Sequence, residues 1–253
     1  MRSTGREFTA TVPGPDGQQD AIAVLSGVQK SYFLDAVPVH VIKGVDLLVR
    51  PGHFTVLLGP SGSGKTTLLN MIGCIDRPDG GTVQVAGCQV DQLSDDALSD
   101  FRARHIGFIF QNFNLLPVLS AYENVEYPLI LAGTSAKTRG ERVAKLLDAV
   151  GLADKAKNLP GQLSGGQRQR VAIARALARK PKLVIADEPT ANLDSLAGAS
   201  ILALMRRMQK RYQISFIFSS HDRDVIKAAD DTIFITDGVI RSISRKDAGT
   251  PGR

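Results

Sequence analysis

The chain has 253 residues but contains no tryptophan, only two cysteines and no long apolar run. Cys74 and Cys88 are too few for a disulfide framework and do not form a CxxC metal pair, so we expect reduced thiols that take part in packing. The N-terminal residues include no apolar segment of the kind that a secretory signal needs. No apolar stretch approaches the roughly 18–20 residues of a membrane-spanning helix, so we expect a soluble chain that would rely on other chains for any membrane spans.

Acidic residues are in short supply relative to basic ones. Lys and Arg number 31 against 25 for Asp and Glu, which gives a net charge of +6. This excess fits a nucleic acid, an anionic membrane surface or an anionic small ligand, and composition alone does not choose among them. A hydrophobic share of 43% with 22% charged residues is that of an ordinary globular protein, which excludes a disordered chain, a collagen-like repeat and a coiled-coil rod.

Short apolar runs alternate with helical patterns along most of the chain. This alternation predicts an α/β fold with a mainly parallel sheet, and the hairpin-like strands before residue 58 predict an additional antiparallel sheet. Residues 1–21 are polar and contain several Pro and Gly residues, so we expect a flexible tail. Residues 112–161 show helices and loops but no clear strand, and we interpret them as an inserted helical subdomain. We expect strands at 23–28, 45–49, 53–58, 106–110, 183–186, 214–218, 232–236 and 239–243, and helices at 140–150, 164–179 and 196–211.

The segment after the strand at 53–58 fits the pattern G-x-x-x-x-G-K-[ST], and a helical pattern follows it directly. Glycines in such a loop let backbone N–H groups approach phosphate oxygens, and the following helix N-terminus adds positive potential. Lys65 can then reach the β- and γ-phosphates of a nucleotide, and the Thr66 hydroxyl can bind Mg²⁺. The alternative is a glycine-rich turn that matches by chance, which the flanking strand and helix disfavour. The loop consists of Gly59, Pro60, Ser61, Gly62, Ser63, Gly64, Lys65 and Thr66.

Two acidic residues, Asp187 and Glu188, directly follow the apolar strand at 183–186. Carboxylates at the C-terminal end of a strand lie where α/β sheets place their ligands. Asp187 suits Mg²⁺, and Glu188 suits a general base that polarises the attacking water. Alone, such a pair would more often belong to a helix N-cap or a turn, but together with the phosphate-binding loop it predicts nucleotide hydrolysis.

A third motif, LSGGQ at 163–167, opens the helix at 164–179. Ser164 is a suitable N-cap, with Gln167 three residues later. Each glycine in a first turn costs about 1 kcal/mol relative to alanine, so we expect a ligand that approaches this backbone closely. The segment predicts a second phosphate-binding helix N-terminus, and we expect it to serve an ATP held by another subunit. We expect most of the basic residues of 168–182 to form a solvated or ion-paired helix face.

In this order the motifs resemble those of the ATP-binding subunits of ABC transporters, over roughly residues 22–245, which leaves a C-terminal tail at 246–253. The resemblance implies a P-loop NTPase (RecA-like) core with an antiparallel β subdomain and an inserted helical subdomain. It also implies ATP and Mg²⁺ as ligands, and a signature segment that closes over the γ-phosphate of the partner subunit's ATP. The residues assigned to this contact in trans are Ser164, Gly165, Gly166 and Gln167.

The same resemblance assigns roles to residues outside these motifs. Gln111, directly after the strand at 106–110, matches the glutamine that contacts Mg²⁺ and the attacking water and senses the transmembrane partner. Asp194 matches the loop that crosses the dimer interface, and His221 matches the histidine that contacts the γ-phosphate. Tyr32 matches the aromatic residue that stacks on adenine, with a partly exposed core aromatic as the alternative. The resemblance thus assigns ATP binding to Tyr32, the loop 59–66 and Thr67, Mg²⁺ binding to Thr66, Gln111 and Asp187, and catalysis to Glu188, His221 and Gln111.

Within the family, segments 70–78, 110–117, 122–129 and 186–195 resemble a bacterial group of lipoprotein-release and macrolide-export ATPases. This similarity implies a homodimer of the ATPase subunit, bound to separate transmembrane permease subunits at the cytoplasmic face of the inner membrane. The dimer would power export or membrane extraction of a substrate.

Two other functions compete with this interpretation. A soluble ABC-type ATPase that acts on nucleic acid or ribosomes usually carries two cassettes, long coiled coils or zinc modules, and this sequence shows none of them. A regulatory module that holds ATP without hydrolysing it is disfavoured because Lys65, Asp187, Glu188 and His221 are all present. We therefore expect an ATPase without a nucleic-acid partner.

Overall fold

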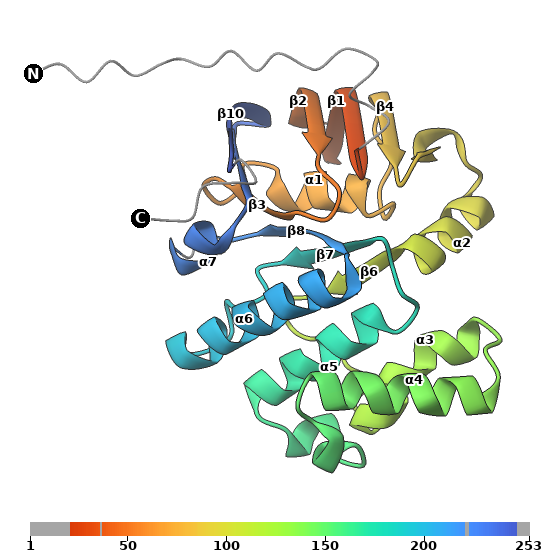
Figure 1. Ribbon diagram of the computed structural model, residues 1–253. Helices are drawn as coiled ribbons and strands as arrows, with labels where there is room; N and C mark the ends of the chain where they lie inside the picture. Colours follow the sequence, from red (N-terminus) through yellow and green to blue (C-terminus); the bar gives the residue numbers. More distant parts are fainter. Residues whose placement is uncertain (1–20, 36, 221–222, 247–253) are drawn as a thin grey trace, which may run out of the picture.

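The computed structural model describes residues 21–35, 37–220 and 223–246 (Figure 1). Two β-sheets face each other across helix α1 (Lys65–Ile72). The longer helices α5 (Gly165–Leu177) and α6 (Ser195–Tyr212) lie on the other side of the larger sheet. The predicted N-terminal tail falls outside the described residues except for Ala21, and so does most of the predicted C-terminal tail.

The larger sheet has six strands in the order β10-β9-β3-β8-β7-β6. The strands from β9 to β6 are parallel, and β10 pairs antiparallel to β9. The fold class predicted from the sequence is therefore confirmed. The strands are β3 (Phe54–Leu58), β6 (Ile106–Ile109), β7 (Leu183–Asp187), β8 (Ser215–Ser219), β9 (Asp231–Thr236) and β10 (Val239–Arg245).

The smaller sheet is antiparallel, with the strand order β2-β1-β4-β5. Its first two strands extend well beyond the predicted 23–28 and 45–49, and they pair along a long hairpin. Its last two strands were not predicted, because β4 opens with two glycines and β5 is too short for an alternating pattern to appear. The strands are β1 (Ala23–Leu34), β2 (Val37–Val49), β4 (Gly80–Val85) and β5 (Cys88–Gln89).

The segment 112–161 is described throughout and contains helices but no strand. Ser120 and Glu123 form a capping box at the start of α3, which fixes where this helix begins. In Figure 1 the helices α3 and α4 lie together beyond α5, on the side away from the sheet. The α-helices after α1 are α2 (Asp95–His105), α3 (Ala121–Leu131), α4 (Ala136–Ala149), α5 (Gly165–Leu177), α6 (Ser195–Tyr212) and α7 (Arg223–Ala228). The short 3-10 helices are η2 (Val90–Gln92), η3 (Ala153–Lys155) and η4 (Pro160–Gln162).

The larger sheet is buried on both faces, which explains why its strands are continuous apolar runs. Along β3, Val56 belongs to the core shared with α5 and α6, and Leu57 belongs to the core that contains α1 and the smaller sheet. Cys74 lies in this second core, and burial raises the pKa of its thiol to about 12. Both cysteines are free thiols, in agreement with the expectation from the sequence.

Candidate nucleotide-binding site

A cavity of about 760 Å³ lies at the C-terminal ends of β3 and β7. This is the edge at which parallel α/β sheets bind ligands. The cavity brings together the residues that the sequence assigned to ATP, Mg²⁺ and catalysis, except Ser63 and His221. Its lining consists of Tyr32, Val41, Gly59, Pro60, Ser61, Gly62, Gly64, Lys65, Thr66, Thr67, Gln111, Asp187, Glu188 and Ala191. His221 lies outside the described residues.

The loop between β3 and α1 requires glycine at two of its positions for space as well as for conformation. Gly59 has φ of 154°, and a Cβ there would lie 2.0 Å from the carbonyl oxygen of Ile235. Gly64 has φ of 100°, and a Cβ there would lie 2.7 Å from Cδ1 of Ile42. Gly64 is also the N-cap of α1 and offers no side-chain acceptor, so the first N–H groups of this helix remain suited to an anion.

The Lys65 ammonium group lies over this loop. It donates to the carbonyl oxygens of Gly59 at 2.8 Å and Pro60 at 2.9 Å, and it forms no salt bridge with the residues that the structure describes. An ammonium group has three donors, so the charge is held in place by neutral acceptors and can bind a phosphate. Ser63 differs from its neighbours, because its side chain is buried and does not line the cavity.

Hydroxyl groups surround the Asp187 carboxylate. The Thr66 Oγ1 donates to Oδ2 at 2.9 Å, and the Ser219 Oγ donates to Oδ1 at 2.5 Å. The Ser219 Oγ also accepts the backbone N–H of Glu188 at 3.0 Å. Glu188 has φ of 47°, so the chain turns sharply where β7 ends and Glu188 faces the cavity. A threonine hydroxyl, a carboxylate and the Gln111 amide on one cavity are oxygen donors of the kind that Mg²⁺ prefers, so these residues fit the predicted metal.

Ser219 was not identified from the sequence as a site residue. It ends the apolar strand β8, next in the sheet to the strand that carries Asp187. The available signal in the sequence was a serine that directly follows an apolar run. A hydroxyl group that is buried at such a place needs a hydrogen-bond partner, and Ser219 is fully buried.

The backbone around Gln111 is held by two other parts of the chain. The Asn192 Nδ2 donates to the carbonyl oxygen of Gln111 at 3.0 Å and to Oδ1 of Asn112 at 2.9 Å. Arg175, from the last turn of α5, donates to the carbonyl oxygens of Phe113 and Asn114. Both of these acceptor residues have positive φ, 63° and 46°, which is uncommon for non-glycine residues. The loop after β6 is therefore fixed by a residue before α6 and by the helix that carries the signature segment.

The expectation of a solvated or ion-paired face on α5 is wrong for three of its arginines, which bind carbonyl groups, a hydroxyl group or an aromatic ring. Arg175 binds two carbonyl groups, and burial lowers its pKa. Arg168 lies over the Phe113 ring at 5.2 Å from the centroid. Arg170 donates to the Val150 carbonyl oxygen at 2.9 Å and to the Ser200 hydroxyl at 2.8 Å. These side chains connect α5 to neighbouring segments.

The signature segment does not line the cavity of its own chain. Ser164 accepts the Gln167 N–H at 3.3 Å and the Gln167 side chain accepts the Ser164 N–H at 2.9 Å, which forms the expected capping box. A Cβ at Gly165 would lie 3.3 Å from Cδ2 of Leu193, and one at Gly166 would lie 3.7 Å from Cβ of Ala197. At Gly165, tight packing within the chain therefore supplies a second reason for glycine besides an approaching ligand.

Asp194 caps the next helix, since its Oδ1 accepts the Ala197 N–H at 2.8 Å at the start of α6. This bond is an ordinary N-cap and fixes where α6 begins. Asp194 does not line the cavity, so within one chain the structure gives it a structural role only.

Of the two adjacent aromatic residues Tyr32 and Phe33, only Tyr32 is among the residues that line the cavity. Tyr32 lines the cavity and is 40% exposed, whereas Phe33 is 74% exposed and does not line it. The Tyr32 hydroxyl donates to Oδ2 of Asp76 at 2.6 Å, and Lys30 donates to Oδ1 of the same carboxylate at 2.8 Å. Burial and the bond to Asp76 raise the pKa of Tyr32. Burial would raise the pKa of Asp76, but the bonds from Lys30 and Tyr32 outweigh it and lower the pKa.

Known proteins resemble the chain over most of its length. The family model described as ABC transporter matches residues 42–191. The chain is 49% identical over 217 residues to the lipoprotein-releasing system ATP-binding protein LolD of Anaeromyxobacter dehalogenans, covering 85% of this chain and 91% of that protein. It is 44% identical over 231 residues to the macrolide export ATP-binding/permease protein MacB of Rhodopirellula baltica, covering 90% of this chain but 34% of MacB. The chain thus spans about a third of that longer protein.

A solved structure of an ATP-binding cassette also resembles the chain. The dimeric post-hydrolysis state of the ATP-binding cassette MJ0796, bound to ADP and Pi, superposes with a TM-score of 0.82 at 38% identity. The match covers 90% of this chain and all of the MJ0796 chain. Among the described residues, no helix is both long and apolar enough to cross a membrane. By its sequence, its fold and the residues around its cavity, the chain belongs to the ABC transporter family, as an ATP-binding and ATP-hydrolysing subunit.

Proposed function

We propose that the chain binds and hydrolyses ATP in the cavity at the C-terminal ends of β3 and β7 and thereby drives export or membrane extraction of a substrate through separate permease subunits. The observation that carries this proposal is the convergence of a lysine, a threonine hydroxyl and two carboxylates on one cavity beside a glycine-rich loop. The names of LolD and MacB support the direction of transport. They favour a transporter over a soluble ATPase that acts on nucleic acid or ribosomes.

The residues assigned to ATP, Mg²⁺ and catalysis divide the chemistry among them. Lys65 exchanges its carbonyl acceptors for the β- and γ-phosphates, and the N–H groups at the start of α1 bind phosphate oxygens. Glu188 accepts a proton from the attacking water, and His221 contacts the γ-phosphate. Tyr32 stacks on the adenine ring. Mg²⁺ held by Thr66, Asp187 and Gln111 would offset the charge of the phosphates.

Two copies bind two ATP molecules between them, head to tail. Each ATP lies between the loop 59–66 of one chain and the segment 164–167 of the other. The placement of 164–167 away from its own cavity supports this arrangement, as does the similarity to a cassette solved as a dimer. Asp194, between the signature helix and α6, would then meet the second copy.

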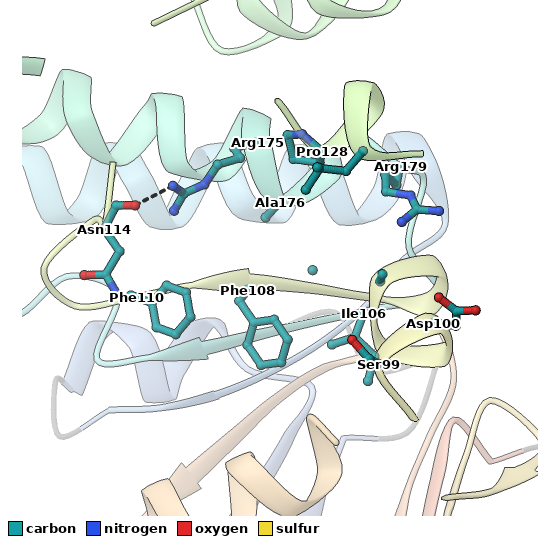
Figure 2. Close-up of a pocket in the computed structure, with 13 residues that line it drawn as sticks. Ser99, Asp100, Ile106, Phe108, Phe110, Asn114, Pro128, Arg175, Ala176 and Arg179 are labelled. Atoms are coloured by element: carbon teal, nitrogen blue, oxygen red, sulfur yellow. Dashed lines mark hydrogen bonds between the residues drawn. The ribbon is translucent and has the colours of Figure 1, made fainter. Parts of the chain in front are cut away.

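A membrane partner docks near residues 111–127, in the groove between α2, β6, α3 and α5 (Figure 2). This groove has a volume of about 470 Å³, and the rings of two residues that line it, Phe108 and Phe110, stack with centroids 5.7 Å apart. Leu131, which lines the groove, is 69% exposed, and Val118, within the segment 111–127, is 81% exposed. A groove lined by aromatic and aliphatic side chains together with charged ones such as Asp100 and Arg179 suits a short amphipathic segment of a permease subunit. Through this contact the chain would lie at the cytoplasmic face of the bacterial inner membrane.

Glu188→Gln tests the catalytic assignment directly. ATP binding should persist, because the glutamine keeps the shape of the site, while turnover should fall by about 10²–10⁴-fold with the loss of the general base. The closed dimer should accumulate in the presence of ATP. Steady-state hydrolysis, nucleotide binding and light scattering of the purified chain measure the three effects.

The matched control is Glu141→Gln, which removes an exposed glutamate of α4 away from the cavity and should leave turnover unchanged. Normal hydrolysis by the Glu188→Gln variant would show that another group activates the water.

A further inference from the structure

Strand β8 carries one buried serine at each end, Ser215 and Ser219, with exposed fractions of 2% and 0%. Each hydroxyl accepts one backbone N–H, that of Gly52 at 2.8 Å for Ser215 and that of Glu188 at 3.0 Å for Ser219. Within the described ranges, Ser219 alone of the two also hydrogen-bonds an acidic side chain, because its Oγ donates to Oδ1 of Asp187. The two serines therefore share strand, burial and bonding type, but they differ in what they touch.

We propose that Ser219 is a positioning residue for both acids of the hydrolytic site. It acts through Asp187, whose carboxylate it orients, and through the backbone of Glu188, whose turn it holds. The inference rests on the function proposed above, in which these two acids serve the metal and the attacking water. It adds a residue that neither the motifs nor the comparisons assign.

For Asp187, the hydroxyl of Ser219 decides which way the carboxylate faces. Rotation about the last side-chain bond of an aspartate is soft, so the carboxylate does not choose an orientation by itself. Ser219 holds Oδ1, which leaves Oδ2 directed at the Thr66 hydroxyl at 2.9 Å. The two oxygen donors intended for Mg²⁺ are thereby aligned before any ligand binds. Partners of metal ligands commonly fix orientation in this way.

For Glu188, the same hydroxyl stabilises a backbone conformation that the residue would not adopt alone. A φ of 47° is uncommon for glutamate, and such conformations persist only where the surroundings hold them. The bond from the Glu188 N–H to the Ser219 Oγ supplies one such constraint at the point where β7 ends. A hydroxyl can donate and accept at once, and here it does so between two adjacent residues. Alanine can do neither, whereas threonine can do both.

The experiment compares Ser219→Ala, Ser219→Thr and Ser215→Ala in the full chain. Binding of trinitrophenyl-ATP is followed by fluorescence, first with a chelator and then during titration with Mg²⁺, and steady-state kcat and KM are measured separately. For Ser219→Ala we expect unchanged binding of trinitrophenyl-ATP in the presence of the chelator. The Mg²⁺ concentration at the midpoint of the fluorescence titration should be about tenfold higher than in the wild type, and kcat should be about tenfold lower. Ser219→Thr should resemble the wild type, and Ser215→Ala should leave both quantities unchanged.

The outcomes test the positioning role of Ser219 and the proposed function separately. If Ser219→Ala titrates with Mg²⁺ as the wild type does, the positioning role is overturned. The same conclusion follows if Ser215→Ala or Ser219→Thr loses as much as Ser219→Ala, because the effect would then come from packing of β8. A wild-type chain whose nucleotide binding ignores Mg²⁺ and which does not hydrolyse ATP would instead overturn the proposed function itself.

Discussion

The two ends of the parallel sheet differ in how they use acidic residues that are buried or partly buried. At the end where β9 begins, Asp230 and Asp231 each receive two hydrogen bonds from one arginine, Arg206 and Arg50 respectively. At the other end, where β7 finishes, the hydrogen bonds that the described residues donate to the Asp187 carboxylate all come from hydroxyl groups. The described part of the chain pairs the first two carboxylates with arginines and gives the third no salt bridge, which fits the Mg²⁺ site that we propose there.

This difference separates residues that hold the fold from residues that hold the substrate. A paired, partly buried carboxylate stabilises the protein as long as its arginine is present, because breaking such a pair leaves a charge without compensation. A carboxylate that meets only hydroxyl groups costs stability or contributes little, and its charge is available for chemistry. Substitutions at the two ends should therefore change different measurements.

The largest expected effect is on activity at the ligand-binding end. Asp187→Asn should lower hydrolysis by at least about 100-fold, because it removes the charge intended for Mg²⁺. The free energy of unfolding should change by less than about 1 kcal/mol, since an amide of the same shape still accepts the Thr66 hydroxyl. ATPase assays and urea denaturation measure the two quantities on one sample. If Asp187→Asn greatly lowered the free energy of unfolding and left hydrolysis normal, Asp187 would stabilise the fold as Asp230 and Asp231 do, and the two ends of the sheet would not differ.

The next effect is on stability at the opposite end. Arg206→Ala should destabilise the protein by about 2–3 kcal/mol, because Asp230 loses its cation while both side chains are partly buried. The Arg206 guanidinium also lies over the Phe54 ring at 5.3 Å from the centroid, so packing is lost as well. ATP binding and kcat should remain those of the wild type. Urea denaturation together with the ATPase assay provides the measurement.

Arg207→Ala is the matched control for this variant. Arg207 is the next residue of α6, is exposed and forms no salt bridge with the described part of the chain. Its removal should change the free energy of unfolding by less than about 0.5 kcal/mol. Equal losses for Arg206→Ala and Arg207→Ala would mean that the pair with Asp230 contributes nothing specific.

The parallel sheet could be predicted from the sequence because strands that are buried on both faces are mostly consecutive apolar residues, as in Phe54–Leu58. The same reasoning missed α2, which buries only Leu98 and so shows no helical periodicity. The signals at its ends were present: Ser94 caps the helix, acids follow in the first turn, and Arg102 and Arg104 lie in the last. Capping and charge therefore locate a helix of this kind better than its apolar pattern does.

The motifs identified the side chains that line the cavity, since each motif is a short run whose chemistry can be read locally. The residues that hold these side chains in place could not be found in that way. Ser219 meets Asp187 across 32 positions, Arg175 meets Phe113 across 62, and Asn192 meets Gln111 across 81. Contacts of this range depend on the order of strands in the sheet, which single motifs do not encode.

The smallest expected effect concerns pH and uses the acid at the fold-stabilising end. Burial would raise the pKa of Asp230, but the bonds from Arg206 and from the Phe54 N–H outweigh burial and hold the pKa below its usual range. A carboxyl whose pKa is lower in the folded state stabilises the protein above its unfolded pKa of about 3.9, and this contribution is lost as the pH falls through the folded value. Asp230→Asn removes the charge at every pH.

The wild type should therefore be more stable than Asp230→Asn near neutral pH, and the difference should shrink steadily below about pH 4. Urea denaturation of both proteins between about pH 7 and pH 3 measures the difference directly. A difference that stays constant over this range would assign the stability to the hydrogen bonds that asparagine also forms, and not to the charge. The contrast with Asp187 would then rest on bond geometry alone, because the two ends of the sheet would no longer differ in how they use a carboxylate charge.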